Sequence, residues 1–559
     1  MKKKITSLAL LISALLITGC SENSVEGKGR GFMGEITVEV TGDKDEITDI
    51  KLVSHKETGL VIDRAFPILK ERIIEAQSPI VDSVSGATYT SLGIKRAVNE
   101  ALKEAGQDFG RITLDTKGPE LPEAYLEDVN TSIVIVGGGP AGLAAAISAR
   151  EAGVEDVILI EKLDLLSGNG KYDRNFFGIV NSEAQRRDGD TATAETLYED
   201  MLKTNTMDSP SRLKSWANGA SLVDSWLRTM GITLDGRLGA NGHMRHNDLD
   251  KPDAYAGDHI QVNMEKRVEE LGVDLRTGTA GLDLIMEDGK AVGVKVQNKN
   301  NFYSINADAV IIATGGFVAN QDLVFENNPE VKGFAHSNQI GATGDFLPVF
   351  EDNNIKTEHM DVLSIFGFIL TSTRDLTGEG AGFVLVNQEG DRFINEGTGG
   401  VTRGRTILNQ TDGVAYYIYD NSLKDSSYRL TSQEAKGLHA KGESFAELAE
   451  NLGLDVDSFV ETMTQYQKDA LNGEDSLGNI ARPLDGAGPY YGMEVESAVH
   501  MTKGGVASNE KTEVLAEDGS VVEGLYAAGE VTSTRAAYSG SVVFGRIAGE
   551  SAATFLETK

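Results

Sequence analysis

A glycine-rich turn followed by an acidic residue is the part of the sequence with the clearest chemical meaning. The turn spans residues 137–142 (GGGPAG), and Glu161 follows at the spacing found in dinucleotide sites. Gly137 allows a tight turn, Gly139 lets the backbone approach a pyrophosphate, and Gly142 permits close packing of a helix on a sheet. Glu161 can accept hydrogen bonds from a ribose. The pattern therefore predicts a bound dinucleotide.

The elements that must position this turn lie on both sides of it. Residues 133–136 are apolar and predict a buried strand, residues 141–152 are rich in alanine and predict a helix, and residues 157–160 predict a second strand. The N-terminus of such a helix faces a phosphate with its partial positive charge. The glycines alone could form an ordinary turn, but strand, helix and acid in this order favour the cofactor site.

Two later segments favour FAD over NAD as the dinucleotide. An apolar strand at residues 307–312 runs into residues 313–316 (ATGG), and residues 524–530 (GLYAAGE) lie near the C-terminus. Both resemble the return segments of flavoproteins with two dinucleotide-binding folds, in which the chain wraps the FAD a second and a third time. No second glycine-rich strand–helix–strand unit is visible in the sequence for NAD(P)H, so we expect no direct use of nicotinamide.

A second candidate flavin site lies in residues 82–91 (DSVSGATYTS). Thr88 is on a glycine-containing turn ahead of a predicted helix, where a phosphodiester can rest on backbone N–H groups. The segment is similar to the motif of FMN-binding domains in which a flavin transferase attaches FMN to the threonine covalently, through a phosphoester bond. The alternative is a polar turn that caps a helix beginning near Ser91.

The sequence around Thr88 predicts a small α+β module, because alternating apolar residues are followed by two stretches with helical periodicity. The expected elements are strands at 34–40 and 47–53, helices at about 65–76 and 91–104, and then a proline-containing linker over 107–128.

The N-terminus predicts export and a lipid anchor. Lysines at positions 2–4 precede an apolar run over residues 5–17 that is too short for a comfortable membrane span. The run ends at Thr18-Gly19-Cys20, which resembles a bacterial lipobox. We therefore expect Cys20 to be diacylated and to hold the protein at the outer face of the bacterial cytoplasmic membrane; a secreted protein or an uncleaved anchor is the alternative.

Composition excludes several classes of function. Cys20 is the single cysteine, so the chain cannot form an internal disulfide, attach a haem through Cys-x-x-Cys-His or hold an iron–sulfur cluster. We expect organic redox cofactors and no metal site. The formal net charge of −33 excludes nucleic acid as a partner. With 559 residues, the chain should divide into several domains.

With both flavin motifs in place, the chain resembles the soluble fumarate-reductase family, which includes flavocytochrome c and urocanate reductase. Landmarks at 341–345 (GATGD), 386–396 (VNQEGDRFINE), 499–505 (VHMTKGG) and 544–550 (FGRIAGE) carry the resemblance, which covers residues 30–559. It implies an α/β fold class: an FAD-binding two-dinucleotide-binding (Rossmann-like) domain, interrupted by an α+β clamp domain and preceded by a small α+β FMN-binding domain. The predicted divisions are a lipoprotein signal peptide and lipobox at 1–20, a tether at 21–30, the FMN-binding domain at 31–108, a linker at 109–129, the FAD-binding domain at 130–350 and 496–559, and the clamp domain at 351–495.

The resemblance also implies which residues hold the FAD, which is expected to be non-covalent. The expected cofactor-binding residues are Gly137, Gly139, Ala141, Gly142, Glu161, Lys162, Asn169, Ala313, Thr314, Gly315, Asp345, Gly529, Glu530, Ser541 and Val542.

Members of this family reduce a carbon–carbon double bond conjugated to a carboxylate. Reduced FAD gives a hydride from N5, and an arginine supplies the proton. Counted without gaps from Glu396, the position of that arginine is occupied by Gly400. Arg403 or Arg405 could reach the site if the loop bulges, and we favour Arg403; either could instead be a solvated surface residue.

The residues expected to contact the substrate differ from the family pattern, and the differences make the pocket more apolar. His500-Met501-Thr502 stands for a His-His-Thr run, so Met replaces a substrate-binding histidine, and Phe366 stands where another would be. An apolar pocket suits an aryl or alkyl acrylate better than fumarate, whose second carboxylate would be left unpaired. The expected site residues are Arg403, Arg405, Arg535 and His500 for catalysis and Phe366, Met501, Thr502 and Tyr538 for the pocket.

Two further positions differ from the family. Leu376 and Glu379 stand where a glutamate and an arginine deliver protons to the catalytic arginine. Arg535 is then the best remaining carboxylate clamp, since a guanidinium can grip a carboxylate with two bonds; it could also be a surface residue on a turn.

Three functions are compatible with these features. The first is an exported respiratory ene-reductase that takes electrons from a membrane or extracellular donor through FMN to FAD. The second is an FAD-dependent dehydrogenase of the same fold, because the reductase arginine is displaced. The third is a flavin electron-transfer lipoprotein. Intact FAD motifs argue against the third, although an electron relay needs them too.

Overall fold

The computed structural model describes residues 23–42, 46–57, 59–166, 168–172, 176, 178–234, 236–237, 244–245, 256–365, 367–378, 382–473, 475–478 and 482–559. The predicted signal segment with Cys20, the pocket residue Phe366 and Glu379 lie outside these residues. The chain divides into two compact units, residues 1–121 and 122–559. None of the helices in the described ranges is long and apolar enough to cross a bilayer.

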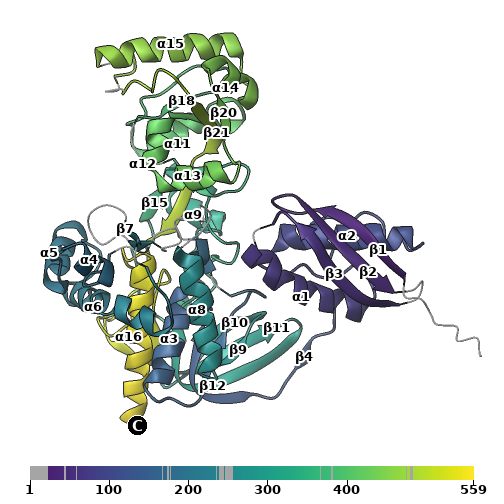
Figure 1. The fold of residues 1–559 in the computed structure, drawn as a ribbon. Coiled ribbons are helices and arrows are strands. Elements are labelled where there is room, and N and C mark those ends of the chain that lie inside the picture. The colour runs from purple at the N-terminus through teal and green to yellow at the C-terminus, as the bar shows by residue number, and fades with distance from the viewer. Residues whose placement is uncertain are drawn as a thin grey trace, which may run out of the picture. The chain divides into compact units, whose positions relative to one another are not determined.

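The smaller unit is a three-stranded antiparallel sheet covered by two helices (Figure 1). Its elements are β1 (Asn23–Arg30), β2 (Glu35–Gly42), β3 (Ile47–His55), α1 (Gly59–Ala76) and α2 (Thr88–Glu104). Alternate residues of β2, including Ile36 and Val38, are fully buried. Helix α2 begins at Thr88, so Ser91 lies within the helix instead of at its start.

The prediction of a tether at residues 21–30 is wrong for most of its length, because residues 23–30 form β1 and pair with β2 along their whole length. The segment has little apolar character because α2 lies directly against it. A Cβ at Gly27 would sit 2.1 Å from the Ala97 carbonyl oxygen, and one at Gly29 would sit 2.0 Å from that of Gly93. Small residues and turn-like composition therefore mark a close helix–strand contact here.

The larger unit is built on a sheet with the order β10-β11-β12-β5-β6-β9, and β25 extends it by pairing with β12. Strands β5, β6, β9, β12 and β25 are parallel where they pair, whereas β10, β11 and β24 are joined by antiparallel pairing. The strands are β4 (Ala124–Tyr125), β5 (Val129–Val136), β6 (Val157–Ile160), β9 (Asp274–Arg276), β10 (Thr279–Glu287), β11 (Lys290–Asn298), β12 (Asn301–Ile312), β24 (Glu513–Leu515) and β25 (Val521–Ala527).

Strand β5 separates two hydrophobic cores, because its side chains alternate between the faces of the sheet. Ile133 and Ile135 pack with the helices α3 (Pro140–Glu151), α8 (Ala256–Glu270) and α16 (Tyr538–Glu557), which Figure 1 shows beside one another. Val134 and Val136 face the opposite core, which includes residues of β10, β11 and α10 (Leu347–Asp352). The glycine-rich turn at the end of β5 is thus held by a strand that is buried on both sides.

Short elements surround this sheet and the cofactor cleft. They are η1 (Gly168–Tyr172), α4 (Glu183–Arg187), α5 (Ala194–Thr204), α6 (Pro210–Ala220), α7 (Val223–Thr229), β7 (Gly236–Arg237), β8 (Met244–Arg245), α9 (Gln321–Asn327), η2 (Pro329–Val331), β13 (Ala335–His336), β14 (Thr357–Glu358), β15 (Leu363–Ile365), β22 (Ala498–Thr502) and β23 (Gly505–Val506).

A separate sheet with the order β17-β16-β21-β19-β18 forms the clamp, which lies at the end of the unit opposite the C-terminus (Figure 1). Its elements are β16 (Phe368–Leu370), β17 (Leu376–Thr377), β18 (Val384–Val386), α11 (Gly400–Leu408), η3 (Thr411–Gly413), β19 (Ala415–Asp420), α12 (Asn421–Ser426), α13 (Tyr428–Ala435), β20 (Ala440–Gly442), α14 (Phe445–Leu452), α15 (Val456–Asn472) and β21 (Tyr490–Glu496).

The clamp begins later than residue 351, the predicted boundary. Ile355 belongs to the core behind β5, β14 pairs with β23, and β15 pairs with β22. The clamp sheet itself starts at Phe368. Residues 351–365 therefore belong structurally with the FAD-binding part, a placement that depends on pairing with strands about 140 residues later in the chain.

Candidate active site

The glycine-rich turn between β5 and α3 leaves open backbone where a phosphate could approach. Gly137 has a φ of 112°, and a Cβ at Gly142 would lie 1.8 Å from the Gly137 carbonyl oxygen, so both positions require glycine. A Cβ at Gly139 would meet no atom within 4 Å, which leaves the N-terminus of α3 open. The predicted residue Ala141 is buried in the first turn of this helix.

Glu161 follows β6 and is buried behind the turn. Its carboxylate accepts hydrogen bonds from the N–H groups of Gly138 and Leu163, both at 2.8 Å. Burial raises the pKa of this carboxyl group, and the two N–H donors and nearby lysines oppose the shift. Glu161 therefore fixes the shape of the turn, and its oxygens keep further lone pairs for a ribose hydroxyl.

The predicted cofactor residues Lys162, Asp345 and Asn169 are held by hydrogen bonds to other polar groups. Lys162 Nζ donates to Thr343 Oγ1 at 2.5 Å and to Asp345 Oδ2 at 2.6 Å, which joins two predicted cofactor residues. Asn169 Nδ2 donates to Asn338 Oδ1 at 2.6 Å, and Asn169 Oδ1 accepts from the N–H of Gln339 at 2.9 Å.

A partly open cleft is formed by the segments after β12 and β25. Thr314 Oγ1 is buried and has no hydrogen-bond partner among the described residues, and Gly315, with a φ of 76°, has open space at its α-carbon. The cleft is lined by Thr314, Gly315, Gly316, Phe317, Gly344, Phe346, Leu347, Gly504, Gly505, Glu530 and Val531. A free buried hydroxyl and exposed backbone at glycines are what a flavin nucleotide would use, so these residues fit FAD.

The C-terminal segment completes the cleft. Gly529 has a φ of 84°, and a Cβ there would lie 2.9 Å from the Ala141 Cβ. Ser541 Oγ donates to the Ala537 carbonyl at 3.2 Å in the first turn of α16, and Val542 is buried behind it. Ala313 directly follows β12 and lies beside Gly137. The structure thus brings the three predicted FAD segments together.

Glu530 and Thr502 connect the cleft to β22. The Glu530 carboxylate accepts from the Thr502 N–H at 3.1 Å, and burial raises the pKa of Glu530 to about 7. Thr502 Oγ1 lies 3.4 Å from Glu530 Oε1 and accepts from the Phe317 N–H at 3.3 Å. Thr502, predicted for the substrate pocket, is buried, and its contacts are with the cleft residues Phe317 and Glu530.

His500 and Met501 precede Thr502 on β22. His500 Nδ1 lies 2.8 Å from Ser337 Oγ, and burial, together with nearby Arg429 and Lys503, lowers the pKa of His500 to about 4. The imidazole is therefore neutral at pH 7. Met501 Sδ lies 3.6 Å from Lys503 Nζ.

The two candidate arginines on α11 point to different partners. Arg403 is half-buried: its Nη1 donates to the carbonyls of Glu396 and Thr398 at 3.2 and 3.3 Å, and the guanidinium lies 4.8 Å from the centre of the Phe368 ring. Burial lowers the pKa of Arg403. Its Nε is buried without a partner among the described residues, so this donor is available to a ligand.

Arg405 instead joins the clamp to the FAD-binding part. Its guanidinium donates to the Lys332 carbonyl at 3.1 Å and to the Pro329 carbonyl at 2.8 Å, and the residue is half-buried, as Arg403 is. These contacts satisfy carbonyls of η2 and place Arg405 on the surface between two elements. Of the two arginines, Arg403 is the one with a buried N–H that has no partner among the described residues.

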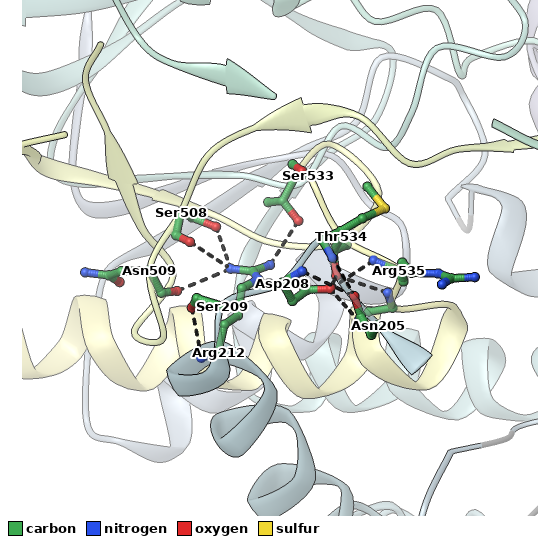
Figure 2. Close-up of polar contacts among 12 residues, drawn as sticks. Asn205, Asp208, Ser209, Arg212, Ser508, Asn509, Ser533, Thr534 and Arg535 are labelled. Carbon is green, nitrogen blue, oxygen red and sulfur yellow. Dashed lines mark hydrogen bonds and ion pairs between the residues drawn. The ribbon is translucent and has the colours of Figure 1, made fainter. Parts of the chain in front are cut away.

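Arg535 is positioned by a buried ion pair that the sequence analysis missed (Figure 2). Asp208 Oδ2 accepts from the Arg535 N–H and from Thr534 Oγ1, both at 3.1 Å, while Asp208 Oδ1 accepts from Arg212 Nε at 2.9 Å. The Arg535 guanidinium donates to the Thr204 carbonyl at 2.7 Å. Only the i, i+4 spacing of Asp208 and Arg212 hints at this pair in the sequence.

Tyr538, the remaining pocket candidate, is the first residue of α16 and is buried. Its ring packs edge-on against Phe176, with 5.3 Å between ring centres, and its hydroxyl lies 3.5 Å from the Gly257 carbonyl. These contacts place Tyr538 in the core beneath the C-terminal loop.

Thr88 lies at the start of α2, in the smaller unit. Gly86 has a φ of 89°, and the N-cap residue Ala87 has no side chain to cap the helix, so N–H groups of the first turn remain available to a phosphate. The Thr88 side chain is partly exposed. Beside it, the exposed rings of Tyr89 and Phe32 lie 5.8 Å apart. The turn has the open donors and the hydroxyl that a flavin phosphate needs.

Comparisons with known proteins identify both cofactor domains. The FAD binding domain family matches residues 132–542, and the FMN-binding domain family matches residues 31–103. The chain therefore carries a binding domain for each flavin.

Individual relatives are similar over most of the chain. A urocanate reductase of Eggerthella lenta is 30% identical over 563 residues, which cover 94% of this chain and 91% of the relative. An NADH:fumarate oxidoreductase of Klebsiella pneumoniae (strain 342) is 28% identical; the match covers 93% of this chain but 57% of that relative, so the chain spans little more than half its length. A flavocytochrome c3 fumarate reductase, solved in an open conformation, matches with a TM-score of 0.69 and 30% identity over 76% of this chain and 78% of the other.

Proposed function

The chain belongs to the fumarate reductase-like family of flavin oxidoreductases that act on carbon–carbon double bonds, and on that premise we propose that it is an exported respiratory ene-reductase. Electrons would pass from a membrane or extracellular donor through FMN on Thr88 to FAD. Bound FAD supplies the hydride that reduces the double bond of an α,β-unsaturated carboxylate.

The observation that carries the choice of substrate is the position of Met501. Met501 lies beside Thr502 on β22, next to the FAD cleft, at the position where the family pattern has a second histidine, and its thioether lies 3.6 Å from Lys503 Nζ. An aryl or alkyl group can pack against a thioether. With the first carboxylate held by cationic side chains, a second carboxylate that faced the thioether would be desolvated without a hydrogen-bond donor from Met501, which costs free energy. An acrylate with an apolar end is therefore preferred to fumarate or urocanate.

The chain's own residues would divide the remaining work. Arg535, on the loop held by Asp208, grips the substrate carboxylate, and Arg403 holds the proton destined for the α-carbon. His500 is neutral, and its hydrogen bond with Ser337 would fix the orientation of the imidazole ring in the pocket. These roles place positive charge where negative charge develops on the substrate.

Thr88 would be the FMN attachment site. The support is local: a hydroxyl at the start of a helix, an uncapped first turn and a glycine with positive φ. A flavin transferase would join the FMN phosphate to Thr88 Oγ1 during maturation. A covalently held FMN cannot diffuse away from an exported protein, which suits an electron relay outside the cell.

The proposal of export and anchoring is supported by the lipobox-like sequence that ends at Cys20. A Cys20→Ser variant should lose its fatty acyl chains and leave the membrane pellet for the soluble fraction of the producing cells. Equal amounts of wild type and variant in the pellet would rule out the lipid anchor.

The activity can be tested with the flavinylated protein from residue 21 onward and reduced methyl viologen as anaerobic electron donor. Steady-state rates would be compared for cinnamate, acrylate, methacrylate, fumarate and urocanate. The proposal predicts the highest kcat/KM for an acrylate with an apolar substituent. A higher kcat/KM for fumarate would overturn the substrate assignment, and no turnover with the panel would favour the dehydrogenase or electron-transfer functions.

A further inference from the structure

Lys503 is a partly buried lysine beside the FAD cleft that the roles above leave unused. Its backbone is fixed on both sides, because the Lys503 N–H donates to the Val362 carbonyl at 2.9 Å and its carbonyl accepts from the Thr534 N–H at 3.0 Å. The next two residues, Gly504 and Gly505, line the cleft. The backbone position of Lys503 is therefore fixed next to the residues that line the cofactor cleft.

The ammonium group of Lys503 makes no ion pair within 4 Å among the described residues; its one close polar contact is Met501 Sδ at 3.6 Å. Burial lowers the pKa of Lys503, nearby Arg535 lowers it further, and Glu530 and Asp208 oppose the shift. Both carboxylates already have other partners: Glu530 accepts from Thr502, and Asp208 accepts from Arg212.

Arg535 differs from Lys503 in being exposed, but it also lacks an ion-pair partner among the described residues. Its guanidinium donates to the Thr204 carbonyl, and no carboxylate pairs with it in the described part of the chain. The two cations repel each other, since Arg535 helps to lower the pKa of the half-buried Lys503, and an anion bound between them would offset that repulsion. A negatively charged ligand would be attracted by both cations.

We propose that Lys503, together with Arg535, binds the carboxylate of the substrate and is thereby a specificity-determining residue. Residues two apart in an extended chain point to the same side, so the Lys503 ammonium and the Met501 thioether offer the substrate one charged and one apolar contact. A molecule with one carboxylate and an apolar end matches this pair. The inference rests on the proposed function for the identity of the substrate.

The test measures how tightly two probe ligands bind to the oxidised protein that contains both FAD and FMN. The change in flavin absorbance reports the binding. The probes are 3-phenylpropanoate and 3-phenylpropanamide, which have the same shape but differ in charge. Wild type should bind the acid about 10- to 100-fold more tightly than the amide, the range expected for a hydrogen bond between charged groups. Lys503→Met should lose most of this preference while binding the amide as wild type does, and Lys503→Arg should retain it.

The matched control is Lys511→Met, which makes the same change at an exposed lysine and should bind both probes as wild type does. Undiminished preference for the acid in Lys503→Met would overturn the inference. The comparison of acid with amide in wild type needs no variant, and equal affinities there would overturn it as well.

Failure of the inference can be separated from failure of the proposed function. If wild type reduces enoates and Lys503→Met keeps the wild-type KM for the carboxylate substrate, only the inference fails. If wild type reduces no enoate but still prefers the acid probe in a Lys503-dependent way, only the proposed function fails.

Discussion

Asp208 and Arg212 form a buried ion pair, with 2.9 Å between Oδ1 and Nε and side chains that are 0% and 3% exposed. Arg212 also donates to Ser508 Oγ at 2.6 Å and Thr532 Oγ1 at 3.1 Å, and its guanidinium lies 4.1 Å from the centre of the Phe544 ring. Figure 2 shows the pair between α6 and the C-terminal loop. The pair therefore holds the loop that presents Arg535.

Replacing Arg212 with Met should lower the free energy of unfolding by about 3–5 kcal/mol, because Asp208 would remain buried without its partner. Urea denaturation followed by tryptophan fluorescence measures this directly, since Trp216 and Trp226 are the only tryptophans and lie in α6 and α7. The matched control is Lys203→Met, which breaks an exposed pair with Asp200 and should cost about 0.5 kcal/mol or less. Similar losses in the two variants would contradict the role given to Asp208 and Arg212.

Thr88→Ala should abolish the flavin that stays with the polypeptide after denaturation, because the phosphoester needs the hydroxyl oxygen. In-gel flavin fluorescence and the intact mass of the protein report the result. The control is Thr90→Val, two residues along the same helix, whose hydroxyl donates to Glu57 Oε2 within the unit. That variant should be less stable but still carry the flavin. Wild-type covalent flavin in Thr88→Ala would place the attachment elsewhere.

Arg403→Ala and Arg405→Ala should differ in their effect on turnover. Loss of a proton donor reduces kcat by about 10²- to 10⁴-fold, and we expect that loss for Arg403. Arg405 binds backbone carbonyls of η2, so its replacement should change kcat by less than about tenfold. Viologen-linked rates with the best enoate of the panel would show the difference. Wild-type kcat in Arg403→Ala would exclude Arg403 as the proton donor.

The stability of the flavin-free protein should depend on pH because of Glu530. Burial raises the pKa of its carboxyl group to about 7, so the folded state holds this proton at pH values where the unfolded chain has lost it. The stability contributed by this proton is fully present below the ordinary glutamate pKa and is lost as the pH rises to about 7. Thermal unfolding at about pH 5 and about pH 8 should show a larger loss of stability in wild type than in Glu530→Gln. The exposed control Glu517→Gln should behave as wild type, and an unchanged pH response in Glu530→Gln would contradict the assignment.

Features encoded by neighbouring residues could be predicted from the sequence. The turn at residues 137–142 and the turn before Thr88 depend on local glycines, so their positions between strand and helix or ahead of a helix follow from short motifs. β1 was predicted as a tether, because its glycines gave no sign that α2 packs against them.

Contacts between distant segments could not be predicted in the same way. Arg212 meets Ser508 and Thr532 about 300 residues later, and Lys503 approaches Arg535 only because Thr534 pairs with the Lys503 backbone. Neither contact has a short motif. The sequence likewise could not distinguish the two candidate proton donors, Arg403 and Arg405. They differ in the carbonyl groups that they contact, which only the structure shows.

The most direct test of the central claim is a competition between cinnamate and fumarate at equal concentrations. The flavinylated protein would be supplied anaerobically with reduced methyl viologen, and both products would be quantified by NMR from the same reaction. We expect 3-phenylpropanoate to form faster than succinate, because Met501 offers an apolar contact and no partner for a second carboxylate. Faster formation of succinate, or neither product, would contradict it.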